Sequence, residues 1–80
     1  SGRIRLVREL RDRGFYVRWH AYEFLLYREG LVGVLLLEPS KGVAELLCRS
    51  DAPREAVERD VRAALSQVAP EVALRLRVVS

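Results

Sequence analysis

Two apolar runs separated by a short polar turn restrict the fold of this chain more than any other feature. The first run spans Leu31–Leu37 and the second spans Val43–Arg49, with the segment EPSKG between them. The proline and the glycine of that segment are residue types that favour tight turns. We therefore predict a β-hairpin. A membrane span needs about 20 apolar residues, so the first run is too short to be one, and we expect no membrane-spanning segment.

A helix is predicted over residues 52–68, where apolar residues recur at helical spacing: Val57, Val61, Ala64, Leu65 and Val68. Asp51 can cap this helix, and Pro53 suits its first turn. Glu55 and Glu58 each precede an arginine by four residues, a spacing that brings opposite charges together on the exposed side of a helix. Pro70 ends the helix.

The remaining segments carry shorter patterns. Residues 72–79, VALRLRVV, alternate apolar side chains with arginines and predict a final half-buried strand. Residues 14–19, GFYVRW, also alternate and predict a strand. In residues 20–28 the apolar positions fall at helical offsets that end before Gly30, so we predict a short helix there. A single long strand through Tyr27 is the alternative.

The N-terminal arm, residues 1–13, fits two interpretations. Ile4 and Leu6 alternate as in a strand, whereas Ile4, Val7 and Leu10 suit a helix equally well. The arm is therefore left unassigned. Residues 14–80 read strand, helix, strand, strand, helix, strand, which is the ferredoxin-like βαββαβ order of the α+β class. This order predicts an antiparallel sheet with two helices on one face.

An apolar sheet face is the consequence of that arrangement. If both helices cover one side of the sheet, part of the hairpin faces away from them, and we expect this part to include Leu35, Leu37, Val43 and Leu47. Exposed apolar patches of this kind usually mark interfaces. The patch predicts self-association of the chain through its sheet, as a homodimer or a larger homo-oligomer. The arm folding back across the patch is the alternative.

Composition places the chain among small globular domains. Hydrophobic residues make up 50% and charged residues 31% of the 80 residues, which predicts a packed core in a single domain, residues 1–80. No export pattern is visible at the N-terminus, so a cytoplasmic location is expected. The absence of Asn, Thr and Met, with a single lysine, fits a thermophile and a GC-rich genome equally well.

Two families share short patterns with this chain. The glycine and the arginine of GFYVR, Gly14 and Arg18, followed by GLVG at Gly30–Gly33, are similar to a pattern of the acylphosphatases, whose glycine-rich loop presents an arginine to phosphate. That family also needs an asparagine to position the attacking water. This chain contains no asparagine, and Leu37 stands near the place, so we reject an acylphosphatase activity.

The second resemblance covers more of the chain. From about Phe15 to Leu65, with EGLVGVLLLEPSKGVAELL at its centre, the sequence resembles a family of small uncharacterised bacterial domains. Those domains have no assigned activity. Because the shared features are turn glycines and core apolar residues, the resemblance implies a ferredoxin-like fold and no particular chemistry.

Catalytic and metal sites lack the residues they need. Cys48 is the only cysteine and His20 the only histidine, so a Cys/His zinc site would be short of ligands. A thiolate and base made from these two would require them to meet, and Cys48 shares the parity of Ala44 and Leu46, which predicts a buried thiol. We expect no metal, no cofactor and no enzymatic activity.

Single-stranded nucleic acid, in particular RNA, is the alternative partner. Most of the surplus positive charge of +3 lies in residues 1–18, where arginines outnumber Glu9 and Asp12. Some ferredoxin-like sheets stack bases on aromatic residues of the open face and bind phosphates through nearby arginines. If the first and last strands are neighbours, one such surface would combine Tyr16, Arg18, Arg75 and Arg77.

Overall fold

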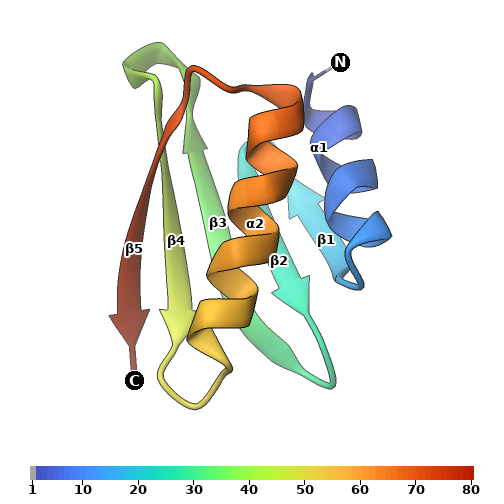
Figure 1. Cartoon of the computed structure of the whole chain (residues 1–80), viewed down its shortest axis with the longest axis vertical. Coiled ribbons are helices and arrows are strands. Elements are labelled where there is room, and N and C mark those ends of the chain that lie inside the picture. The colour runs from blue at the N-terminus through green and yellow to red at the C-terminus, as the bar shows by residue number, and fades with distance from the viewer. Residues whose placement is uncertain (1) are drawn as a thin grey trace.

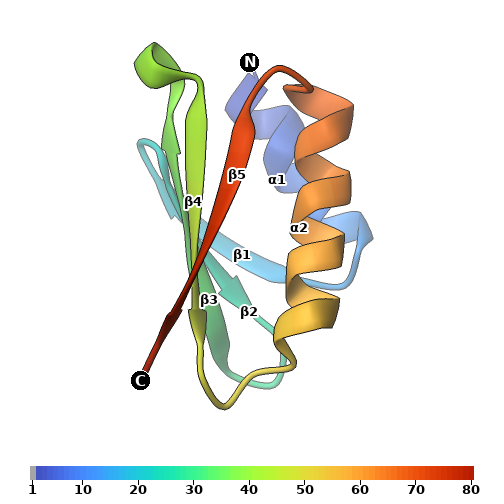
Figure 2. The same ribbon diagram turned by 60° about the vertical axis from the view of Figure 1, so that its left-hand side comes forward.

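The computed structural model describes residues 2–80 and consists of one five-stranded sheet with two helices on a single face (Figure 1). Turning the molecule shows the helices side by side on one side of the sheet and no element on the other (Figure 2). The elements in chain order are α1 (Gly2–Asp12), β1 (Tyr16–His20), β2 (Glu23–Tyr27), β3 (Leu31–Glu38), the 3-10 turn η1 (Pro39–Lys41), β4 (Val43–Arg49), α2 (Arg54–Val68) and β5 (Ala73–Val79). The α+β class is confirmed.

The strands lie in the sheet in the order in which they occur in the chain, from β1 to β5. Strands β1 to β4 pair antiparallel with their neighbours, whereas β5 pairs parallel with β4. The predicted ferredoxin-like order has four strands in an antiparallel sheet, so both the strand count and the strand order differ. Short turns make consecutive strands antiparallel neighbours, and only the crossover through α2 returns the chain in the parallel sense.

The predicted helix in residues 20–28 is wrong, because this segment forms β2. Phe24 and Leu26 are buried and alternate with the half-buried Leu25 and Tyr27, so a period of two describes the segment. The single long strand is also wrong, because a turn at Ala21, which adopts a positive φ of 54°, separates β1 from β2.

The second helix comes instead from the N-terminal arm. Helix α1 buries Leu6, Val7 and Leu10 against the sheet and α2, while Ile4 stays 45% exposed. The helical interpretation of the arm is therefore correct: Val7 and Leu10 are buried as its spacing implies, and Leu6 takes the buried place of Ile4.

The predicted hairpin, second helix and final strand are confirmed as β3–β4, α2 and β5. The predicted cap is wrong: Pro53 occupies the N-cap of α2 with no side-chain hydrogen bond, and Asp51 instead accepts from Arg49 at 2.9 Å. On the exposed side of α2, Glu58 pairs with Arg62 at 2.8 Å as expected. The other expected pair, Glu55 with Arg59, is not formed. Arg59 contacts Asp60 at 3.2 Å instead.

Leu35 lies in the middle of the core and not on the open face. It stands between Phe24 on β2 and Leu46 on β4, and all three side chains are fully buried under the helices. Leu37 shares this side of β3 and packs against the same core. The prediction that Leu35 and Leu37 face away from the helices is therefore wrong. The run Leu31–Leu37 is apolar at both parities, so its pattern does not distinguish the covered side from the open side.

Gly33 lies on the covered side of β3, opposite the buried Cys48 of β4. A Cβ atom at this position would lie 2.7 Å from the backbone oxygen of Leu47, closer than side-chain carbons approach backbone atoms. Only glycine fits this approach between β3 and β4. Because side chains alternate along a strand, Leu35 and Leu37 lie on the same side as Gly33 and beneath the helices.

Arg28 joins three parts of the structure at one end of the core. Its guanidinium lies 3.8 Å from the centre of the Phe15 ring, donates to the backbone carbonyl of Arg13 and donates to Asp60 Oδ2 at 2.7 Å. The turn after β2, the turn after α1 and the helix α2 are thus tied together. The hydrogen bond from Arg28 lowers the pKa of the Asp60 carboxyl below its usual value, against the opposing effect of burial, and Arg59 adds to the lowering.

We expect Leu35→Ala to lower the free energy of unfolding by about 2–5 kcal/mol, because it leaves a cavity among fully buried side chains. The matched change at the neighbouring half-buried position, Leu36→Ala, is expected to cost much less. Urea denaturation of both variants measures the difference. Equal losses would contradict the assignment of the two residues to opposite faces.

The Arg28–Asp60 pair predicts a pH dependence. Because the pKa of Asp60 is lower in the folded state than in the unfolded state, its carboxylate stabilises the fold above the unfolded pKa of about 3.9. This contribution is lost as the pH falls through the folded pKa. Asp60→Asn should therefore lower the free energy of unfolding at pH 7 by about 1–3 kcal/mol, and the difference from the wild type should shrink below about pH 4. Asp51→Asn, at a mostly exposed carboxylate, is the control and should have little effect at either pH.

Candidate interaction surface on the open sheet face

The sheet face opposite the helices carries two rows of side chains that cross all five strands. The pairing registers place one row as Arg18, Leu25, Val34, Leu47 and Arg77. They place the neighbouring row as His20, Glu23, Leu36, Glu45 and Arg75. The first row is aliphatic across its three central strands and ends in arginines, whereas the second row has one central leucine, Leu36, between two glutamates.

An apolar centre occupies the middle of this face. We use this name for four half-buried side chains on β2, β3 and β4, namely Leu25, Val34, Leu36 and Leu47. Two tyrosines extend it towards the β1 edge, where Tyr16 is 61% exposed and its ring meets that of Tyr27 edge-on at 5.7 Å between centroids. Neither helix covers this side (Figure 2).

A charged rim surrounds the apolar centre. It consists of four arginines, Arg18, Arg49, Arg75 and Arg77, and three glutamates, Glu23, Glu38 and Glu45. Arg77 and Glu45 approach to 3.8 Å within it. The two signs nearly balance, so the face as a whole is not a strongly basic surface.

Half of the side chains predicted for self-association belong to this surface. Val43 and Leu47 lie on the open face, whereas Leu35 and Leu37 lie on the covered face. Sequence reasoning missed Leu25, which becomes visible only when residues 23–27 are recognised as a strand, and it missed Val34 and Leu36 through the wrong parity of β3.

The residues predicted for nucleic-acid binding share the open face but do not meet. Tyr16 and Arg18 lie on β1, while Arg75 and Arg77 lie on β5, and three strands separate these edges. At about 4.8 Å between neighbouring strands, the two pairs are about 19 Å apart. The predicted combined surface required β1 and β5 to be neighbours, and the strand order places them at opposite edges.

Cys48 and His20 cannot cooperate in nucleophilic catalysis. Cys48 is fully buried on the covered side of β4, whereas His20 is exposed on the open side of β1, with β2 and β3 between them. Burial raises the pKa of the Cys48 thiol, an effect that Arg54 opposes and Glu58 reinforces. The thiol is therefore kept protonated and inaccessible. Within residues 2–80, no group of His, Cys, Asp and Glu side chains is arranged to hold a metal ion.

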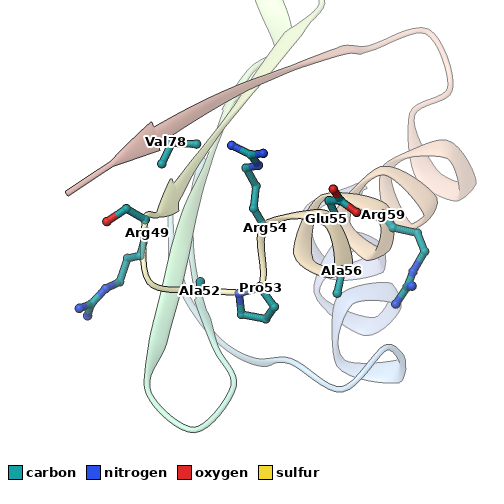
Figure 3. A pocket seen from close by; sticks show the side chains of 9 residues that line it. Arg49, Ala52, Pro53, Arg54, Glu55, Ala56, Arg59 and Val78 are labelled. Carbon is teal, nitrogen blue, oxygen red and sulfur yellow. The ribbon is translucent and has the colours of Figure 1, made fainter.

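The surface hollow at the start of α2 is lined by three arginines that point apart. Arg49, Arg54 and Arg59 extend in three different directions around it (Figure 3). Two of them are already engaged, because Arg49 pairs with Asp51 and Arg59 pairs with Asp60. The positive charges therefore do not converge on a common point where an anion could bind.

No protein-family model, curated protein or solved structure matches this chain. In the part of the chain that the structure describes, neither helix has the length and apolar character needed to cross a membrane. The surface chemistry of residues 2–80 is therefore the basis on which a function can be proposed.

We expect Cys48 to be unreactive towards a thiol reagent such as DTNB at neutral pH in the native protein, and to react fully once the protein is unfolded in urea. Cys48→Ser combined with Ile4→Cys provides the control, because position 4 is 45% exposed and its thiol should react at once. Rapid modification of native Cys48 would contradict its burial beneath α2.

Proposed function

We propose that this chain is a non-enzymatic interaction module that pairs with a second copy of itself through the open face of its sheet. The observation that carries the proposal is the apolar centre, which spans three central strands on a side that no helix covers. In the pairing, the two sheets stack about 10 Å apart, as sheets in sandwiches do. The helices of both copies then lie on the outside.

The charge of this face supports a protein partner over a polyanion. Nucleic-acid sites depend on a surplus of Lys and Arg that neutralises phosphates, whereas the charged rim holds both signs in nearly equal number. A rim of mixed charges around an apolar centre is the usual composition of a protein interface, and Tyr and Arg are the residue types that contribute most at such interfaces. Tyr16 and Arg18 together provide only a small stacking platform.

The open face is just large enough to bind a second copy of the chain, with modest affinity. Five strands about 4.8 Å apart, with a rise of about 3.3 Å per residue, give a face of about 20 Å by 20 Å, or about 400 Å² in flat projection. Side-chain relief adds to this area. Because stable interfaces begin at about 600 Å² per partner, two copies have to overlap over almost the whole face. We therefore expect a dimer whose population depends on concentration.

Leu36→Lys is the sharpest test of this pairing. Leu36 lies directly between Glu23 and Glu45 in its row, so a lysine there gains two cross-strand carboxylate neighbours in the monomer. In the dimer the same ammonium group would be buried in the apolar interface. We expect light scattering to show a concentration-dependent dimer for the wild type and a monomer for Leu36→Lys at every concentration.

Ile4→Lys is the matched control, because it makes the same kind of change on α1, away from the open face. This variant should keep the mass of the wild type. Circular dichroism and urea denaturation check that both variants fold. A wild type that stays monomeric up to millimolar concentration, or a Leu36→Lys variant that still dimerises, would refute the proposal.

A further inference from the structure

The outer edge of β5 carries unpaired backbone groups. Ala73 donates its N–H to Gly42 at 3.0 Å and the carbonyl of Val79 accepts from Ser50 at 2.8 Å, so odd-numbered residues of β5 direct their backbone groups towards β4. Successive residues alternate in this direction, and the N–H and C=O groups of Leu74, Leu76 and Val78 therefore point outwards. Strand β5 is the last in the sheet, and no backbone hydrogen bond among residues 2–80 reaches these groups.

The opposite edge of the sheet is partly blocked. On α1, Arg11 donates to the carbonyl of Val17 in β1 at 3.3 Å, and Arg3 donates to the carbonyl of Ala21 just beyond β1 at 3.1 Å. Arg3 is held there by the aromatic rings of Trp19 and Tyr22, 5.7 Å and 4.7 Å from its guanidinium carbon. Side chains of α1 thus cover part of the β1 edge, and β5 is the more open edge for pairing with another strand.

The side chains of β5 define what kind of strand fits. On the covered side, Leu74 and Leu76 are half-buried and Val78 is 43% exposed, so an added strand would meet an apolar row. On the open side, Arg75 and Arg77 are exposed, and among residues 2–80 Glu45 is the one carboxylate that contacts either of them. An added strand with apolar residues on one side and carboxylates on the other would bury the apolar row and pair with the surplus positive charge.

From this arrangement we infer that the outer edge of β5 is a docking site for an extended segment of a partner protein in which acidic and apolar residues alternate. The backbone groups of Leu74, Leu76 and Val78 supply the affinity, and Arg75 and Arg77 supply the preference for acidic residues. This inference concerns the backbone edge of β5, which is separate from the apolar centre proposed for self-association, although Arg75 and Arg77 also belong to the charged rim.

A second copy of β5 fits this edge poorly. Two β5 strands that pair antiparallel, with their helices on the same side, overlap over most of their length in three registers. These registers are centred on Arg75, Leu76 or Arg77. In each of them an arginine of one strand lies opposite an arginine of the other. Like charges directly opposite destabilise a strand pair. The same two arginines therefore repel a copy of this chain and attract an acidic segment, which is how specificity between partners arises.

A synthetic peptide of alternating glutamate and valine, about seven residues long with blocked ends, is the probe for this site. We expect titration at low salt to shift the amide NMR signals of β5, and amide exchange to slow at Leu74, Leu76 and Val78 but not in β1. The affinity should fall as salt is raised, because charge pairs contribute to it. A peptide carrying N-methyl groups at alternate residues should bind more weakly, because it cannot complete the strand pairing.

Charge reversal decides whether Arg75 and Arg77 select the partner. The double variant Arg75→Glu/Arg77→Glu should bind the glutamate peptide at least about tenfold more weakly and should gain affinity for a lysine and valine peptide of the same length. Leu36→Lys, which disrupts only the proposed self-association, should bind the glutamate peptide as the wild type does. The inference is overturned if the double variant keeps its preference, if exchange slows at β1 instead, or if Leu36→Lys abolishes peptide binding.

Discussion

The packing of both helices on one side of the sheet is the constraint on which the rest of the structure depends. Helices α1 and α2 contact each other and close over the row formed by Phe24, Leu35 and Leu46, whose side chains are fully buried. Because side chains alternate along each strand, covering this row fixes which residues of every strand are buried and which face away. The open face, its apolar centre and its charged rim are all consequences of that single choice.

The segments of this fold that are long, or that are bounded by turn-forming residues, could be predicted from the sequence. The hairpin of β3 and β4 is predictable because a proline and a glycine separate two apolar runs, and α2 is predictable because its apolar residues recur at helical spacing over about three turns. Residues 20–28 were misassigned because Phe24, Leu25 and Leu26 are consecutive apolar residues that fit both periods. The arm could not be assigned because it is short and its burial depends on α2, which is distant in the sequence.

The side of β3 that faces the helices could not be predicted, and this misplaced half of the candidate surface. Apolar side chains at both parities leave the choice to tertiary contacts between the sheet and the helices. The strand order also depends on long-range pairing: β5 returns beside β4 through the α2 crossover, far from β1. As a result, Arg75 and Arg77 are separated from Tyr16 and Arg18, and the two pairs of residues lie at opposite edges of the open face.

The different treatment of the two sheet edges limits how far an assembly of this chain can grow. A sheet that is open at both edges can add strands without end, which is the route to fibres. Here Arg11 of α1 takes up one outward carbonyl of β1 and Arg3 contacts the turn that follows, so the β1 edge is less accessible to another strand than the β5 edge. The proposed pairing through the open face uses the one uncovered face of each copy. Under the two proposals each contact therefore accepts a single partner, and the complex expected from them is two copies of the chain, each extended by one strand.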